Sequence, residues 1–259
     1  MTVFTRALAL IMILPTAAPA DGVKFAELKR WDVVVATNAI PGERYAASEF
    51  TNLLKQATGR SLPIVTETKR RRRHIFIGQS DAMRKSAVGF DVADFGDEDF
   101  RTVVTNNFVA IAGGRPRGTL YGVYSFFETE LGVRYLTASH THVPTIKRSK
   151  VVGPFDRFYH PPFEFRCSYY GENRNVDFAV RLRNNANIRT EPKHGGTARY
   201  RLINHSVQNL LPTRAYGKDH PEYYAEIDGE RRSDVGGRDW SWHGTQPCFS
   251  NPDVIRIIG

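Results

Sequence analysis

The chain of 259 residues lacks long apolar runs, which bears first on its relation to membranes. Its strongest run, from Ala7 to Leu14, is far shorter than the roughly 20 apolar residues that a transmembrane helix needs, so we predict no membrane span. Arg6 precedes this run, and small residues ending at Ala20 follow it. This order is typical of a secretory signal peptide. We therefore expect residues 1–20 to be cleaved after Ala20 and the product to be secreted or periplasmic.

Cysteine is also scarce, because only Cys167 and Cys248 are present. An oxidising compartment would permit a bridge between them. Two thiols far apart in sequence do not form a disulfide framework, and a bridge requires a geometry that the sequence does not give. We favour two buried small hydrophobic residues and leave the bridge open as the alternative.

Acidic residues are in the minority, with 27 Asp and Glu against 36 Lys and Arg and a formal net charge of +9. Clustered basic residues can neutralise nucleic-acid phosphates, but a secreted protein meets little nucleic acid, so we predict no such partner. An anionic polysaccharide or lipopolysaccharide is the expected acidic neighbour. We expect the densest basic run, residues 69–73, to be a solvated loop.

Metal and nucleotide motifs are missing as well. His140 and His142 are spaced to lie on one face of a strand, yet no third ligand follows nearby, so we predict no metal site. Gly113 and Gly114 precede a helix, but the spacing of a dinucleotide-binding loop is absent. No cofactor is therefore expected.

What is present in the first 150 residues is an alternation of short apolar strands and amphipathic helices. Ala46, Phe50, Leu53 and Leu54 recur at helical spacing, and Gly59 ends that helix as a left-handed cap. Asn106 and Asn107 provide the turn of a hairpin. The predicted strands are 31–36, 62–65, 74–78, the two arms of 100–114, and 133–136, and a second helix covers 116–131.

These residues carry a family resemblance. The stretches YAASEFTNLLKQATGRSLPIV, IFIG and VAIAGGRPRGTLYGVYSFFETELGVRYL resemble the N-terminal α/β domain of α-glucuronidases and β-N-acetylhexosaminidases. For residues 21–150 the resemblance implies a small mixed sheet with two helices, of α+β type. Such a domain packs beside a (β/α)₈ barrel and rarely supplies catalytic residues.

The composition of the sequence changes in residues 151–259. Pro154, Pro161 and Pro162 indicate a linker, and strands at 163–170 and 199–205 flank a helix within 176–187, which favours parallel βα units. The stretches PPFEFR, HPEYYAEIDGERR and QPCFSNPDV resemble the DUF4838 region of bacterial glycosidase-like proteins. The resemblance implies an α/β fold that continues into the first βα units of an incomplete (β/α)₈ barrel.

Five residues are candidates for carbohydrate binding. In related barrels an arginine at the end of the first strand binds sugar hydroxyls, and Arg166 has that place here; its planar fork suits paired oxygens. Pairing with Glu164 or Glu172 is the equal alternative. His205 ends a predicted strand, where a structural role is the alternative. Indoles can stack on sugar rings, so the last candidates are Trp240, Trp242 and His243, although anchoring a loop would also explain them.

Catalytic residues cannot be assigned from the sequence. Glycosidases use two carboxyl groups on either side of the scissile bond, and no recognisable acid/base pair is present. A whole barrel takes about 250 residues, so we expect a fragment without turnover. The prediction is a secreted carbohydrate-active protein of glycoside hydrolase ancestry, related to degradation of polysaccharides or uronic-acid-containing glycans. A non-catalytic carbohydrate-binding module or a structural remnant is the alternative, and the sugar, linkage and oligomeric state stay open.

Overall fold

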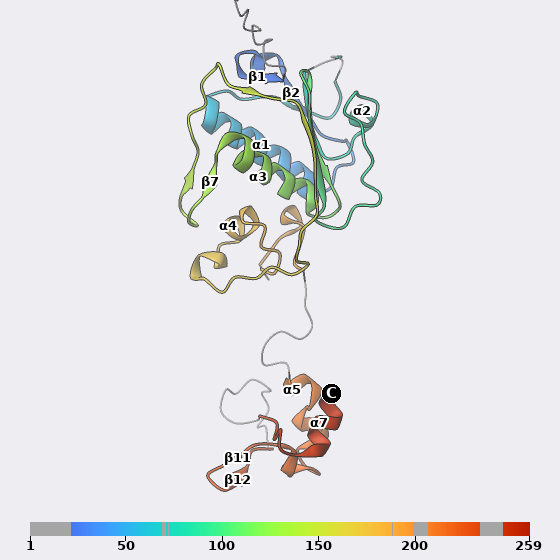
Figure 1. The fold of residues 1–259 in the computed structure, drawn as a ribbon, viewed down its shortest axis with the longest axis vertical. Coiled ribbons are helices and arrows are strands. Elements are labelled where there is room, and N and C mark those ends of the chain that lie inside the picture. The colour runs from blue at the N-terminus through green and yellow to red at the C-terminus, as the bar shows by residue number, and fades with distance from the viewer. Residues whose placement is uncertain (1–21, 69–70, 72, 188, 199–206, 234–245) are drawn as a thin grey trace, which may run out of the picture. The chain divides into compact units, whose positions relative to one another are not determined.

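The computed structural model describes residues 22–68, 71, 73–187, 189–198, 207–233 and 246–259 (Figure 1). The chain divides into two compact units, residues 1–198 and 199–259. The predicted signal peptide lies outside the described residues. Among the described helices, none has the length and apolar character to cross a bilayer.

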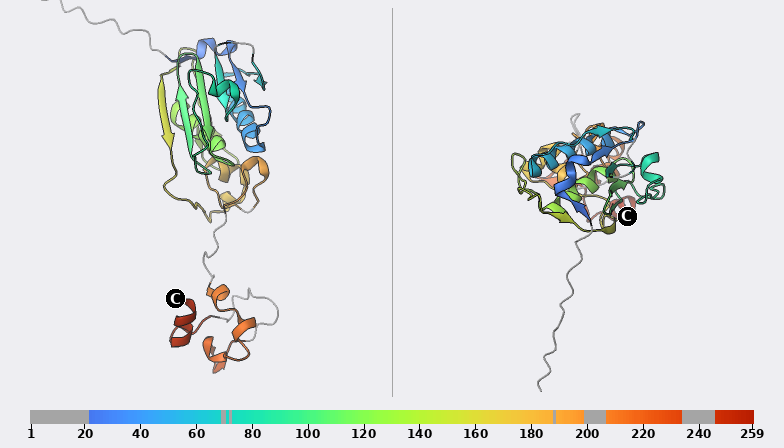
Figure 2. Two further views of the ribbon diagram at one scale, coloured as in Figure 1. Left: turned by 90° about the vertical axis from the view of Figure 1, so that its right-hand side faces the viewer. Right: turned by 90° about the horizontal axis from the view of Figure 1, so that it is seen from above.

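A six-stranded mixed sheet organises the first unit, with the strand order β10-β5-β6-β4-β2-β3. Strands β3, β2, β4 and β6 are parallel, whereas β5 and β10 are antiparallel to their neighbours. Figure 2 shows β10, in yellow, at one edge of the sheet. The strands are β2 (Asp32–Val34), β3 (Ile64–Val65), β4 (His74–Ile77), β5 (Phe100–Val104), β6 (Phe108–Gly113) and β10 (Phe155–Tyr159).

Two long helices, α1 (Pro41–Thr58) and α3 (Gly118–Leu131), lie side by side on one face of the sheet (Figure 1). The predicted apolar residues of α1 are buried, among them Phe50, and so is Phe127 on α3. Gly59 and Gly132 end these helices with φ of 70° and 73°, a conformation in which glycine avoids the steric cost of a Cβ atom. The prediction that Pro116 lies in the first turn of the second helix is wrong, because α3 begins at Gly118.

Alternation along the strands creates a separate core on each face of the sheet. Val33 and Ile75 pack in the core that contains α1 and α3. Their neighbours Val34 and Phe76 pack on the opposite face with Met83 of α2 (Asp81–Arg84). This is the two-residue period of a strand covered on both faces. The predicted sheet with two supporting helices is therefore confirmed.

The stretch after the sheet folds back onto the same unit. The helix α4 (Val176–Arg181) contacts α3, and the short 3₁₀ helix at Pro192–His194 contacts α1. The predicted linker contributes the edge strand β10. The predicted strand at 163–170 is wrong, because the Arg166 amide donates to the side-chain oxygen of the loop residue Asn185, and the Arg166 carbonyl accepts from the Asn185 amide, so Arg166 has no strand partner there.

Short elements complete the first unit. The pair β1 (Val23–Lys24) and β9 (Val151–Val152) brings the two ends of the sheet domain together, and β7 (Arg134–Tyr135) pairs with β8 (Thr141–His142). Two further 3₁₀ helices span Phe25–Arg30 and Gly171–Arg174.

The second unit is small, and its described residues form short helices and one pair of two-residue strands. Its core consists of Leu211, Tyr223, Tyr224 and Val254. The predicted strand at 199–205 lies outside the described residues, and no parallel strand pair occurs in the described part of this unit. The elements are α5 (Val207–Leu210), α6 (Thr213–Tyr216), a 3₁₀ turn (Pro221–Tyr223), β11 (Glu226–Ile227), β12 (Glu230–Arg231) and α7 (Pro252–Ile258).

Candidate functional site

Arg166 lies in the extended segment after β10, with its guanidinium group held by protein atoms. Its Nη2 pairs with the Glu98 carboxylate, its Nε donates to the Arg183 carbonyl at 2.8 Å, and its Nη1 donates to the Phe163 carbonyl at 2.5 Å. The side chain is 19% exposed. Arg166 therefore pairs with a carboxylate, as the alternative to sugar binding predicted. The partner is Glu98, however, and not Glu164 or Glu172.

Glu98 is the centre of a buried polar network. Its side chain is only 6% exposed, and it accepts hydrogen bonds from Arg117 Nε at 2.8 Å and Asn185 Nδ2 at 2.7 Å in addition to Arg166. Arg117 also donates to the Gly195 carbonyl at 3.0 Å. A buried carboxylate is stable only when it is paired and hydrogen-bonded. The network thus fixes the segment around Arg166 and Asn185 against the sheet domain.

A second network joins α4 to the two long helices. The buried Glu49 carboxylate accepts hydrogen bonds from the Tyr124 hydroxyl at 3.0 Å and from Arg181 at 3.1 Å. Burial, reinforced by the Glu49 charge, raises the pKa of Tyr124 well above its ordinary value, so the phenol keeps its proton and donates. These contacts hold α4 against α1 and α3.

Between these anchored segments the surface forms a groove of about 330 Å³, defined here as the Arg166 groove. Tyr169 and Tyr170 project from it with 76% and 82% of their surface exposed. Arg174 and Arg189 add two exposed guanidinium groups, and no described lining residue is Asp or Glu. The described lining is Arg166, Cys167, Ser168, Tyr169, Tyr170, Asn173, Arg174, Ala179, Asn184, Ala186, Asn187 and Arg189.

Asparagine side chains hold the walls of the Arg166 groove. Asn173 is 8% exposed and donates to the Ser168 carbonyl at 3.2 Å, while Asn187 donates to the Asn173 carbonyl at 2.6 Å. Asn175 caps α4 by accepting from the Phe178 amide at 3.0 Å. The aromatic, amide and guanidinium groups are those that stack on sugar rings and bind their hydroxyl or carboxylate oxygens.

The other predicted binding residues, His205, Trp240, Trp242 and His243, lie outside the described residues, and their roles stay predictions. The same holds for a sugar-binding role of Arg166. Sequence reasoning missed Tyr170 and its neighbours in the groove. The adjacent tyrosines of SYYGENR, in a polar stretch, are the signal that could have found them.

The two cysteines and the predicted histidine pair lie at or near the surface. Cys167 is exposed and Cys248 is half-buried, and both are free thiols, so the expectation of two buried residues is wrong for Cys167. His142 lies in β8 and His140 just before it, both exposed. The part of the chain that the structure describes has no group of three His, Cys, Asp or Glu residues able to hold a metal ion.

Several solved structures are similar to this chain at low identity. A family GH115 4-O-methyl-α-glucuronidase is 16% identical with a TM-score of 0.46, over 66% of this chain and 29% of the other. A variant of the Streptomyces plicatus β-hexosaminidase is 16% identical with a TM-score of 0.40, over 66% and 31%. The β-N-acetylhexosaminidase from Streptomyces coelicolor A3(2) is 17% identical with a TM-score of 0.41, over 67% and 32%. The chain thus spans about a third of their length.

Family models give the clearer comparison, since no curated protein matches the chain. Residues 19–126 match the model described as Glycosyl hydrolase family 67 N-terminus. Residues 135–259 match the model described as Domain of unknown function (DUF4838). The predicted resemblance to an α-glucuronidase N-terminal domain followed by a DUF4838 region is therefore confirmed.

Proposed function

We propose that this chain is part of a secreted carbohydrate-active protein of glycoside hydrolase ancestry, and that its Arg166 groove binds a uronic-acid-containing glycan. The observation that carries the proposal is the lining of the groove: two exposed tyrosines and two exposed arginines, without a carboxyl group among the described lining residues. The match to the family 67 N-terminus supports the ancestry. The pattern of residues 6–20 supports secretion.

The chemistry of the groove favours an acidic sugar over a neutral one. Arg174 and Arg189 present planar guanidinium forks that can donate two parallel hydrogen bonds to one carboxylate. Tyr170 offers an apolar ring face for the C–H face of a sugar and a hydroxyl for its oxygens. Because no described lining carboxylate repels the uronate, its charge is favourable throughout the groove.

The same lining favours binding over hydrolysis at this place. Glycoside hydrolysis requires two carboxyl groups, roughly 5–10 Å apart, on either side of the scissile bond. The described residues of the Arg166 groove supply neither. We therefore propose that the groove recognises the glycan, and that any cleavage by a protein of this ancestry uses carboxyl groups outside it.

Isothermal titration calorimetry with two matched probes tests this function. The first probe is an aldouronic tetrasaccharide, a xylotriose that carries one glucuronic acid, and the second is neutral xylotetraose. We expect the acidic probe to bind at least about tenfold more tightly, a difference of about 1.4 kcal/mol. No saturable binding of the acidic probe, or equal affinities that Tyr170→Ala weakens to the same extent for both probes, would contradict the proposal.

Variants locate the binding. Arg174→Gln and Arg189→Gln should each weaken acidic-probe binding by about two- to fivefold, the range of an exposed ion pair. Tyr170→Ala should cost about tenfold through lost stacking. Arg148→Gln is the matched control, because Arg148 is exposed and does not line the groove. Release of reducing ends that depends on a carboxylate of this chain would replace the binding role with an enzymatic one.

A further inference from the structure

A second hollow, larger than the Arg166 groove, lies at the edge of the sheet where the parallel strands end. It measures about 1120 Å³ and is defined here as the strand-end crevice. Its walls come from the segments that follow four strands: residues 36–38 after β2, 66–68 after β3, 79–82 after β4, and Arg115 after β6. Among the described residues, its lining shares no member with the Arg166 groove.

The topology places the crevice at a switch point of the sheet. The chain leaves β2 through α1 toward β3 on one side, and it leaves β4 toward β5 and β6 on the other side. The loops after β2 and β4 therefore diverge and leave a hollow between them. In open α/β sheets, ligands bind outside the carboxyl ends of strands at such points.

A helix that starts at such an edge usually binds a phosphate or another anion at its N-terminus. In this chain a carboxylate of the protein itself occupies the N-terminus of α1. The buried Glu43 carboxylate accepts a hydrogen bond from the Ile40 amide at 3.0 Å at the start of α1, and it pairs with Arg115 at 3.2 Å. Gly78 makes room for it, because a Cβ atom there would lie 3.0 Å from the Glu43 side chain. A second negative charge at this point would be repelled.

The charges of the crevice agree with this exclusion. Its described lining contains three carboxylates, Glu67, Asp81 and Asp91, against two guanidinium groups, Arg84 and Arg115. Arg84 pairs with Asp81, and Arg115 pairs with Glu43. In a chain with a net charge of +9, the crevice is thus slightly acidic, unlike the Arg166 groove. An acidic glycan is disfavoured here.

Hydrogen bonds hold two polar side chains of the crevice, Gln79 and Asp91, in place. Gln79 donates to the Phe90 carbonyl and to Asp91, both at 3.2 Å. Asp91 also accepts hydrogen bonds from the Val92 and Ala93 amides. The hydrogen bond from Gln79 contributes most, and together with these two it holds the pKa of Asp91 below its ordinary value. Asp91 is therefore an ionised acceptor near neutral pH.

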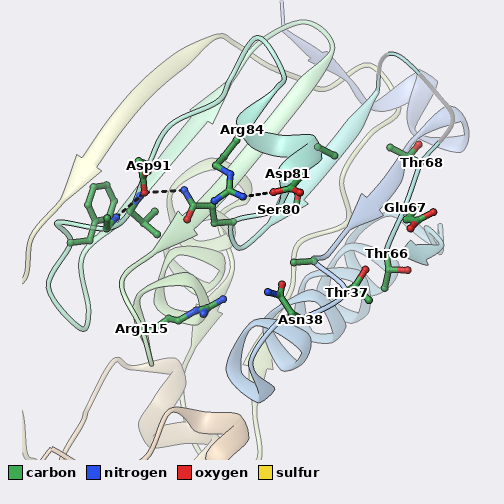
Figure 3. Close-up of a pocket in the computed structure, with 16 residues that line it drawn as sticks. Thr37, Asn38, Thr66, Glu67, Thr68, Ser80, Asp81, Arg84, Asp91 and Arg115 are labelled. Atoms are coloured by element: carbon green, nitrogen blue, oxygen red, sulfur yellow. Dashed lines mark hydrogen bonds and ion pairs between the residues drawn. The ribbon is translucent and has the colours of Figure 1, made fainter.

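Figure 3 shows the two polar walls of the crevice. Thr37, Asn38 and Thr66 lie along one side with Glu67, and Asp91 lies on the other, while Arg115 stands at one end between them. Thr37, Asn38 and Thr66 are exposed. Hydroxyl, amide and carboxylate groups on facing walls can accept from and donate to the hydroxyls of a sugar from both sides.

We propose that the strand-end crevice is a second binding site, and that its ligand is a neutral saccharide. The combination of a switch-point hollow, a resident carboxylate at the start of α1 and a polar, slightly acidic lining favours an uncharged, hydroxyl-rich molecule over a nucleotide or a uronate. The crevice and the Arg166 groove share no described lining residue. This proposal can therefore be tested independently of the proposed function.

Calorimetry on the whole chain tests the proposal with named probes: xylohexaose, cellohexaose and chitohexaose as neutral saccharides, and AMP and inorganic phosphate as anions. We expect at least one neutral hexasaccharide to bind saturably and neither anion to bind. Thr66→Trp, which places an indole at the wall, should weaken that binding by at least about tenfold, or about 1.4 kcal/mol. Asn38→Ala, which removes an amide without filling space, should weaken it as well.

Two controls separate the sites. Thr129→Trp changes an equally exposed threonine on α3 that lines neither hollow, and it should leave binding unchanged. Tyr170→Ala should leave neutral-saccharide binding unchanged, although it weakens the acidic probe in the Arg166 groove. The proposal is overturned if none of the three hexasaccharides binds, if Thr66→Trp has no effect on the binding seen, or if an anion binds in a Thr66-dependent way.

Discussion

The guanidinium group of Arg166 pairs with the carboxylate of Glu98, which lies 68 residues earlier in the chain. Arg117 and Asn185 share the same carboxylate, so four side chains from distant segments meet at one buried charge. A carboxylate buried to this degree needs all its partners, because an unpaired charge in the protein interior is very costly. The pair therefore ties the segment that forms the Arg166 groove to the sheet domain.

Replacing this carboxylate should destabilise the first unit. Glu98→Gln keeps the shape but leaves Arg166 without its carboxylate partner and Arg117 with only the exposed Asp97 at 3.3 Å, and we expect the free energy of unfolding to fall by about 3 kcal/mol. Urea unfolding followed by circular dichroism measures it. Glu130→Gln is the control, since its partner Arg157 is 57% exposed, and it should cost no more than about 1 kcal/mol. Equal losses in the two variants would contradict the role given to Glu98.

The elements of the first unit could be predicted because their signals are local. Phe50 and Leu54 recur at helical spacing, and Gly59 and Gly132 end their helices where a residue with positive φ is needed. The hairpin around Asn106 likewise depends on residues adjacent in sequence. Such patterns need no knowledge of distant contacts.

The segment after the sheet could not be predicted in the same way. The apolar alternation of residues 163–170 favours a strand, but Asn185 meets the backbone groups of Arg166 from a loop. The edge strand β10 pairs with β5, about 50 residues earlier, and prolines on both sides suggest a linker instead. Tertiary hydrogen bonds overrode local propensity in both cases.

The candidate sites were harder still to find in the sequence. The strand-end crevice takes its walls from four separate loops, and nothing in the sequence of Thr37, Gln79 or Arg115 marks them as neighbours. They meet because parallel strands end at one edge of the sheet. Of the residues that line the Arg166 groove, only Arg166 was predicted from the sequence, and Tyr169 and Tyr170 were not.

Close backbone packing at the first residue of α3 gives a second stability prediction. A Cβ atom on Gly118 would lie 2.1 Å from the Asp99 carbonyl oxygen, which is part of the backbone and cannot rotate away. We expect Gly118→Ala to lower the free energy of unfolding by about 3 kcal/mol or more, as overpacking does. Gly171→Ala is the control, because a Cβ atom there meets nothing within 4 Å, and its effect should stay within about 0.5 kcal/mol of zero. Thermal and urea unfolding both report the difference.

The Asp177 carboxylate makes part of the stability depend on pH. Burial opposes its ionisation, but hydrogen bonds from His194 at 3.0 Å and Tyr45 at 3.1 Å prevail and hold the pKa of Asp177 below its ordinary value of 3.8. The unfolded chain then binds more protons than the folded one in this range. The stabilisation is complete above the unfolded pKa and is lost as the pH falls through the lower folded pKa.

Asp177→Asn should therefore flatten the loss of stability between pH 5 and pH 3, about one unit either side of the ordinary carboxyl pKa. The urea midpoint, measured at half-unit steps of pH, shows the slope for the variant and the parent. Asp94→Asn changes an exposed aspartate and should keep the parental slope. An Asp177→Asn slope as steep as that of the parent would refute this linkage.

Ionic strength should distinguish the two proposed binding sites, because only one of them uses unpaired positive charge. Raising the salt concentration from about 0.1 M to 1 M shortens the screening length from about 10 Å to 3 Å. Binding of the aldouronic tetrasaccharide in the Arg166 groove should then weaken by about two- to fivefold, the range expected when an exposed ion pair is screened. Binding of the neutral hexasaccharide in the strand-end crevice should not change. The double variant Arg174→Gln/Arg189→Gln should remove the salt dependence of the first probe, and a salt effect that persists in it would place the acidic glycan elsewhere.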